Sequence, residues 1–216
     1  MSNLLANIIV LAPPLIFSLT IHEYAHARMA LAFGDPTAKM MGRVSLNPLR
    51  HLDLIGTIAL FLVHFGWAKP VPVNPANLHP RRAGNIAVSL AGPMSNLLIA
   101  AACGVILRAE HDLQLGERYG LLVGAAPVLM ITMAINLVLC VFNLVPLFPL
   151  DGHHILREIL PLTKQLEYMQ WQVRYGRWAL LGLIFVPRMM NAPGPLSYLF
   201  DSVIDPVVAW VTGGGA

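Results

Sequence analysis

Long runs without charged residues dominate the pattern of hydrophobic and polar positions along the chain. Residues 4–22, 86–107 and 121–150 contain no Asp, Glu, Lys or Arg. A helix needs roughly 20 apolar residues to cross a membrane, so each run predicts a membrane-spanning helix. Residues 178–200, which Arg188 interrupts, predict a weaker fourth span.

The first run continues in a helical pattern to about residue 33, where the sequence Gly-Asp-Pro at 34–36 predicts the end of the helix. Proline lacks the backbone N–H that a helix interior uses. Pro13 and Pro14 therefore predict that this helix is kinked or divided.

The section between the first two runs predicts irregular structure. Residues 54–66 are apolar but short for a straight span, which favours a re-entrant or interfacial segment. Residues 42–49 alternate like a short strand, and residues 66–80 contain too many prolines for a helix. Irregular backbone at membrane depth is tolerated only inside protein or beside a wet cavity. We therefore expect this section, with its short strand-like stretch, to form a cavity wall.

The positions of Lys and Arg predict the orientation. Basic residues occur in 34–53, in 67–84 and after residue 151, whereas 108–119 mix both signs of charge. Cytoplasmic loops are enriched in Lys and Arg, so the first helix is expected to end in the cytoplasm and the 121–150 helix to return there. This arrangement puts the N-terminus outside and residues 22–26 and 151 at similar depth.

Composition agrees with lipid as the solvent. Apolar residues make up 56% of the 216 residues and charged residues 12%, against about 25% charged in soluble proteins. The mean hydropathy is +0.65. We predict an all-α polytopic membrane protein with about four to six membrane segments in the lipid bilayer. It is expected to be a single domain over 1–216, with a core at 3–155 and a C-terminal helical portion at 156–216.

Two further compositional features narrow the function classes. The net charge is +3 and no run of Lys or Arg occurs, so a nucleic-acid partner is not expected. The first apolar run lacks a basic region before it and leads directly into a candidate site, so we expect a retained, membrane-inserting segment rather than a cleaved signal. Cys103 and Cys140 both lie in apolar runs and are expected to be buried free thiols.

The sequence HEYAH at 22–26 carries the candidate chemistry. Two histidines at i and i+4 share one helix face, so His22 and His26 can bind one metal ion. Glu23 is rotated by about 100° from His22 and can reach a water molecule there without acting as a ligand. In isolation the motif could be an ordinary polar surface. Within a membrane helix, however, ionisable residues are costly and usually functional.

Catalytic zinc takes three protein ligands, so a third residue is required. Asp151 is our candidate, because it follows the Pro-containing run NLVPLFPL and precedes Gly152, which permits a sharp turn. The alternative is that Asp151 only caps the following helix. His153, His154 and His64 also compete as ligands, although a satisfied buried histidine is the plainer interpretation of His64.

Two asparagines lie in the apolar runs and allow two interpretations each. The sequence AGPMSN places Gly92 and Asn96 inside the second run, and Asn143 ends the third. Small residues there could serve close helix packing. Alternatively, Gly92 could allow a close approach beside the metal, and Asn96 and Asn143 could donate hydrogen bonds to a substrate carbonyl or its oxyanion.

These motifs resemble the site-2 proteases, a family of intramembrane zinc metalloproteases, and most closely its short prokaryotic branch without a PDZ domain. HEYAH at 22–26, AGPMSN at 91–96 and NLVPLFPLDG at 143–152 carry the resemblance, in this order within apolar helices. GRVSLNPLRHLDLIGT and FGWAKPVPVNP are also similar to that branch, which implies a short membrane-associated β region between the first two core helices. The resemblance covers residues 18–152, roughly two-thirds of the chain.

The resemblance implies a role for each matching residue. It implies that His22, His26 and Asp151 bind zinc, that Glu23 is the catalytic carboxylate, and that Asn96 and Asn143 lie near the active centre. The family cleaves transmembrane helices of protein substrates on the cytoplasmic side, which implies the prokaryotic cytoplasmic membrane as the location. One departure is visible, because His153 follows Gly152 where many members have a second Gly.

We therefore predict a zinc-dependent intramembrane endopeptidase that cleaves peptide bonds within or near transmembrane helices of membrane protein substrates. The alternative is a metal-binding membrane protein without hydrolysis, such as a transporter or an inactive scaffold, which would use the same histidines. Glu23 discriminates between the two classes, since a site that only binds metal has no need of that carboxylate.

Overall fold

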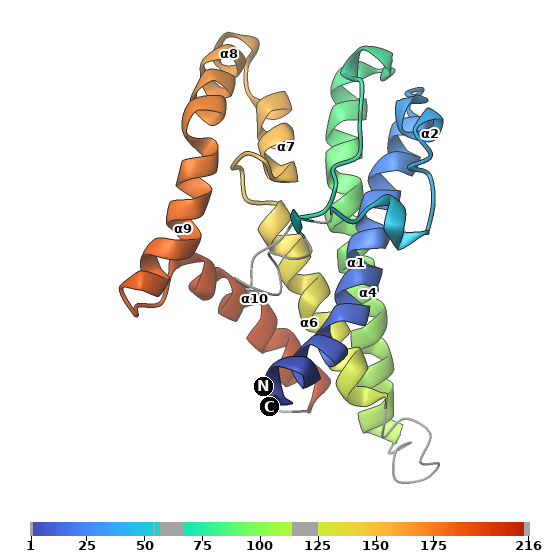
Figure 1. Cartoon of the computed structure of the whole chain (residues 1–216), viewed down its shortest axis with the longest axis vertical. Helices are drawn as coiled ribbons and strands as arrows, with labels where there is room; N and C mark the ends of the chain where they lie inside the picture. Colours follow the sequence, from blue (N-terminus) through green and yellow to red (C-terminus); the bar gives the residue numbers. More distant parts are fainter. Residues whose placement is uncertain (1, 54, 57–66, 114–124, 214–216) are drawn as a thin grey trace. The chain divides into compact units, whose positions relative to one another are not determined.

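The computed structural model describes residues 2–53, 55–56, 67–113 and 125–213, and these residues form helices, turns and loops without a strand (Figure 1). The predicted all-α class is therefore confirmed. The chain forms two compact units, Met1–Asn96 and Leu97–Ala216. The single domain over 1–216 stays a prediction.

The first unit begins with one long helix, α1 (Ser2–Ala32), which includes Pro13 and Pro14. Of the two outcomes predicted for these prolines, division does not occur, and a kink stays a prediction. The end of the helix agrees with the sequence, because Gly34 has a φ of +97° and the Asp35 N–H donates to the Ala30 carbonyl at 2.9 Å. A left-handed residue after the last turn satisfies carbonyls that the helix leaves open, and glycine adopts it at little cost.

The first half of α4 (Arg81–Leu113) lies beside α1 (Figure 1). Buried Ala30, Leu78 and Val88 form the apolar core between them, with Phe33 packed against it. A Cβ on Gly84 would approach the Cβ of Leu78 to 2.9 Å, so this contact requires a glycine. The close approach brings residues of α4 to the histidine face of α1.

The segment between α1 and α4 contains α2 (Thr37–Met40) and two short 3-10 helices, η1 (Pro48–Arg50) and η2 (Pro75–Asn77). The strand predicted over 42–49 does not form. Asn47 turns the chain there, since its side chain accepts from the Leu49 N–H at 3.0 Å and Pro48 follows it. Such local side-chain bonds compete with strand formation.

One isolated antiparallel bridge, Leu52 with Ala68, occurs among the described residues of this segment. The predicted β region is thus not confirmed beyond that bridge. The re-entrant segment predicted over 54–66 includes residues 54 and 57–66, which lie outside the described residues.

Asp35 holds the loop after α1 against the loop before α4. Its carboxylate accepts hydrogen bonds from the N–H and hydroxyl of Thr37, from the N–H of Asn74 and from the side chain of Asn77. Burial raises the pKa of this carboxyl, but the four hydrogen bonds outweigh it and hold the pKa below its usual value.

The second unit contains α6 (Ala126–Asn143), α7 (Asp151–Ile159), α8 (Leu162–Trp171), a π-helical turn η3 (Gln172–Gly176), α9 (Arg177–Met189) and α10 (Pro195–Val211). Its core lies where α6 and α10 pack together, around buried Met133, Leu137 and Val211. The weak span predicted over 178–200 is divided between α9 and α10 by a break at Asn191, whose φ is 49°.

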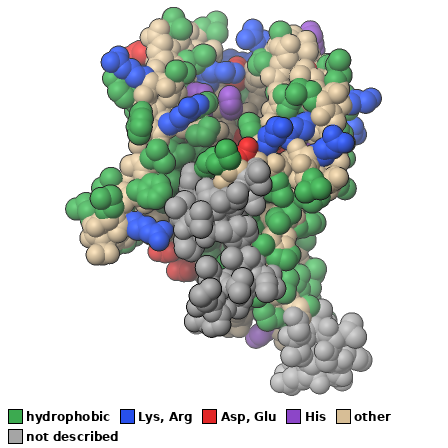
Figure 2. Space-filling model, in the orientation of Figure 1, with side chains coloured by type: hydrophobic (Ala, Val, Ile, Leu, Met, Phe, Trp, Pro, Cys, Tyr) green, Lys and Arg blue, Asp and Glu red, His purple; other side chains and the backbone are tan. Residues whose placement is uncertain are grey.

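Two helices within the described residues are long and apolar enough to cross a membrane, α4 and α6. They contain the predicted run 86–107 and most of the predicted run 121–150. In the first unit, the Lys and Arg side chains gather around α2 and the start of α4 (Figure 2). The number of membrane segments and the orientation stay predictions.

Candidate metal centre

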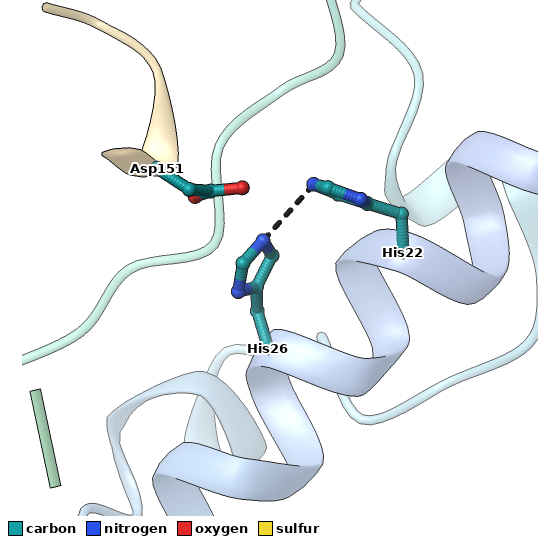
Figure 3. Close-up of side chains that lie close together, drawn as sticks. All are labelled: His22, His26 and Asp151. Carbon is teal, nitrogen blue, oxygen red and sulfur yellow. Dashed lines mark hydrogen bonds between the residues drawn. The ribbon is translucent and has the colours of Figure 1, made fainter. Parts of the chain in front are cut away.

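His22 and His26 project from one face of α1, and both are buried. Their Nε2 atoms lie 3.0 Å apart, and the rings meet edge to face with centroids 4.6 Å apart (Figure 3). The i, i+4 spacing produces this pairing, as expected from the sequence.

The other ring nitrogens of both histidines are held by oxygen acceptors on α4. His22 Nδ1 lies 2.6 Å from Asn96 Oδ1, and His26 Nδ1 lies 2.7 Å from the Val88 carbonyl. An oxygen acceptor requires an N–H, so both Nδ1 atoms carry the proton and both Nε2 atoms present lone pairs in the neutral rings.

Two nitrogen lone pairs that face each other at 3.0 Å repel unless a positive charge is shared between them. A metal cation bound by both rings would supply that charge. The carbonyl and amide partners on Nδ1 are also the groups that fix metal-binding histidines in the correct tautomer. The histidine pair therefore fits a zinc ion by its donor chemistry.

Gly92 leaves the space that this pair needs. A Cβ at this position would lie 2.3 Å from His26 Nε2 and 2.6 Å from His22 Nε2. The sequence left open whether Gly92 serves helix packing or a close approach to a metal. The structure shows that the missing side chain leaves room at the tips of both imidazoles.

Asn96 is fully buried, and its carbonyl oxygen orients His22. This role was not foreseen, since the sequence suggested a donor to the substrate. That donor role stays a prediction. Asn143 ends α6, where its Nδ2 donates to the Leu139 carbonyl at 2.9 Å.

Glu23 follows His22 on α1 and is buried to about the same degree. Among the residues that the structure describes, no hydrogen bond or ion pair to its carboxylate occurs. Glu23 is thus a buried carboxylate next to His22 in the sequence.

In the second unit, Asp151 opens α7 directly after the Pro-containing loop 144–150. The N-cap of α7 is Leu150, and no side-chain cap hydrogen bond forms, so the alternative role of Asp151 as an N-cap is not observed. Gly152 is required by packing, because a Cβ there would lie 2.2 Å from the Leu144 carbonyl oxygen.

His153 packs among aromatic side chains. Its ring stacks on Tyr168 with centroids 5.4 Å apart and meets Phe148 edge to face at 5.7 Å. Burial, and then the nearby His154 and Arg157, lower the pKa of His153 to about 4. These contacts explain how an imidazole is accommodated after Gly152. His64 lies outside the described residues.

His22 and His26 of the first unit and Asp151 of the second unit offer the donor types of a metal site. Two imidazole nitrogens and one carboxylate oxygen are a donor set that suits catalytic zinc.

Comparison with known proteins agrees with this chemistry. The sequence profile of Peptidase family M50 matches residues 121–183. YwhC of Bacillus subtilis, which is named as a zinc metalloprotease, is 38% identical over 202 residues, which cover 90% of this chain and 92% of YwhC.

Two further relatives are also named as zinc metalloproteases. MJ0392 of Methanocaldococcus jannaschii is 27% identical over 72% of this chain and 35% of its own length. Rip2 of Mycolicibacterium smegmatis is 33% identical over 45% of this chain and 39% of its own length. No solved structure matches. Because similarity to a zinc metalloprotease extends over nearly the whole chain, the chain belongs to peptidase family M50, the site-2 protease family, and is a zinc-dependent protease.

Proposed function

We propose that this protease cleaves peptide bonds within or near transmembrane helices of membrane protein substrates. The observation that carries the proposal is the buried His22–His26 pair. Both residues lie on the apolar helix α1, and their Nε2 atoms face each other. A hydrolytic site placed in such a helix suits a substrate that is itself embedded in lipid.

The proposed zinc ligands are His22, His26 and Asp151, the three side chains drawn in Figure 3. When bound, zinc would supply Lewis-acid chemistry, lowering the pKa of a water molecule toward about 7 and polarising the scissile carbonyl. Two observations support this ligand set. In the first unit, residues of α4 orient the two imidazoles, and in the second unit Asp151 lies in the first turn of α7.

Glu23 is the proposed general base. Its carboxylate would accept a proton from the attacking water and deliver it to the nitrogen of the leaving amine. Asn96 would hold the His22 ring through Nδ1, and either Asn96 or Asn143 could donate to the oxygen of the scissile carbonyl.

A helical substrate must unwind before cleavage, because its backbone carbonyls are otherwise engaged in hydrogen bonds. We propose that the unwound segment adds to the backbone of residues 68–74 by β-addition. This stretch has no helical residues, and Asn74 at its end has extended φ and ψ. The active site is proposed to open toward the cytoplasm, on the side where Lys and Arg are enriched.

The direct test is Glu23→Gln, assayed against a panel of purified single-span membrane proteins in detergent or nanodiscs. The variant should keep its zinc and lose cleavage by about 10²–10⁴-fold, the contribution of a general base. A matched control is Glu167→Gln, a change on the exposed surface of α8. Full cleavage by Glu23→Gln would remove the proposed mechanism, and cleavage of soluble unfolded peptides alone would remove the proposed substrate class.

A further inference from the structure

The loop 144–150 directly precedes Asp151. Residues of α8 and η3 form hydrogen bonds with its backbone. Its own turns use only local bonds, such as the Leu147 N–H donating to the Val145 carbonyl and the Leu150 N–H to the Leu147 carbonyl, both at 2.8 Å. Short turns of this kind do not fix the position of a loop against the rest of a protein. That position depends on what its remaining backbone groups contact.

One side chain, Gln172, binds two of these backbone groups. Its Oε1 accepts from the Phe148 N–H at 2.9 Å, and its Nε2 donates to the Pro146 carbonyl at 2.8 Å. The side chain is 1% exposed, so water does not compete for these bonds. A glutamine amide offers a donor and an acceptor about 2 Å apart, which allows it to bind an N–H and a carbonyl of the same loop together.

Tyr168 supports the same attachment from one turn earlier. Its hydroxyl donates to the Pro146 carbonyl at 3.0 Å, so this carbonyl accepts from both residues. Burial raises the pKa of the Tyr168 phenol, with a smaller opposing effect from a hydrogen bond with Gln172. The phenol therefore stays protonated and able to donate.

The π-helical turn of η3 provides the space for this arrangement. It covers Gln172–Gly176, and a Cβ on Gly176 would lie 2.5 Å from Gln172 Oε1 and 3.1 Å from the Cβ of Phe148. The glycine thus lets η3 approach the loop closely. Single π-helical turns inside longer helices are frequent at functional sites.

The Phe148 ring is fixed on two sides as well. The His153 ring meets it edge to face, and the Arg177 guanidinium lies 5.0 Å from its centroid. Phe148 is three residues before Asp151, so a shift of its backbone is passed on to the aspartate through a short chain. Leu150, which lies between them, is buried.

We propose that Gln172 is a positioning residue for this enzyme: it holds the loop 144–150 in the conformation that presents the Asp151 carboxylate to zinc. The C-terminal portion of the chain would then be a working part of the metal centre rather than only an anchor. The inference rests on the proposed role of Asp151 as a zinc ligand.

The experiment compares Gln172→Met with the wild type in the full chain. Methionine keeps the volume and removes both hydrogen bonds. Zinc should dissociate to a chelator about 10-fold faster or more, in line with the loss of a group that orients a ligand. The visible absorption of the cobalt-substituted enzyme should change, kcat should fall with KM unchanged, and amide exchange over 144–150 should accelerate.

Gln165→Met is the matched control. Gln165 lies on α8, the helix just before η3, and it too donates to a backbone carbonyl, that of Leu160 at 3.0 Å, outside the loop 144–150. It should behave as wild type. Gln172→Glu keeps the acceptor for the Phe148 N–H and should retain more zinc than Gln172→Met. If the methionine variant does not accumulate, Gln172→Glu and Gly176→Ala carry the test.

Wild-type zinc release and an unchanged cobalt spectrum in Gln172→Met would overturn the inference, as would equal effects in Gln165→Met. Asp151→Asn separates this failure from a failure of the proposed ligand set. If Asp151→Asn retains zinc as the wild type does, the ligand assignment is wrong and the inference falls with it. If Asp151→Asn loses zinc while Gln172→Met does not, only the inference about Gln172 is wrong.

Discussion

Replacing Gly92 by alanine should damage zinc binding although it adds a single methyl group. The new Cβ would lie 2.3 Å from His26 Nε2 and 2.5 Å from His22 Cε1. Carbon and nitrogen atoms in contact prefer about 3.5 Å or more, so the rings would have to retreat by about 1 Å.

The rings have little freedom to retreat, because each is anchored at Nδ1. His22 is bound to Asn96 at 2.6 Å and His26 to the Val88 carbonyl at 2.7 Å. A displacement of about 1 Å stretches these bonds beyond useful length or turns the Nε2 lone pairs away from the metal. We expect zinc affinity to fall by about 10–100-fold and turnover by about 10²-fold.

Zinc stoichiometry by metal analysis, zinc affinity by chelator competition and cleavage of a single-span substrate would measure these effects. Gly104→Ala is the matched control, because it lies on the same helix and its Cβ would meet only ordinary contacts, the nearest at 3.4 Å from the Met133 sulfur. Both variants gain similar helix propensity. If Gly92→Ala bound zinc and cleaved substrate like Gly104→Ala, the imidazole tips beside Gly92 would not be the zinc site.

Three further predictions concern single side chains. Asp151→Asn should lower zinc content measured after dialysis, and unchanged stoichiometry would point to another third ligand. Asn96→Leu leaves the buried His22 Nδ1–H without its acceptor, so it should weaken zinc binding by about 10–100-fold and cost about 1–3 kcal/mol in unfolding measurements; Asn96→Asp, which restores an acceptor, should retain more zinc. Asp35 has a lowered pKa, so its carboxylate stabilises the fold above about pH 4 and this contribution is lost as the pH falls further. Asp35→Asn should therefore be less stable than wild type at pH 7, by about 1–3 kcal/mol, with the difference shrinking toward pH 3 in thermal unfolding; a constant difference over that range would contradict the argument.

Local rules account for what the sequence predicted well. The apolar runs predicted the long helices because a helix of such composition needs no partner to satisfy its backbone. The His22–His26 pair follows from the helical period alone, and the end of α1 at Gly34 follows from the preference of glycine for a positive φ. The family resemblance of the motifs is confirmed by the relatives.

The same local reasoning failed where a side-chain hydrogen bond favours a turn although the alternation of polar and apolar residues predicts a strand. Residues 42–49 alternate in polarity, yet Asn47 and Pro48 form a turn there because a side-chain hydrogen bond replaces the strand ladder. Pro13 and Pro14 were expected to kink or divide the first helix, and the structure keeps α1 as one element through both prolines.

The sequence by itself determined the pairing of His22 with His26 and the places of the long helices, because both depend on residue type and on spacings of a few positions. Only the tertiary structure decided what supports that chemistry. Asn96 and Val88 reach the histidines from 74 and 62 residues away, and Gln172 reaches Phe148 from 24 residues away. Contacts over such separations depend on how helices pack, and no local preference of Asn, Val or Gln encodes which partner each will meet.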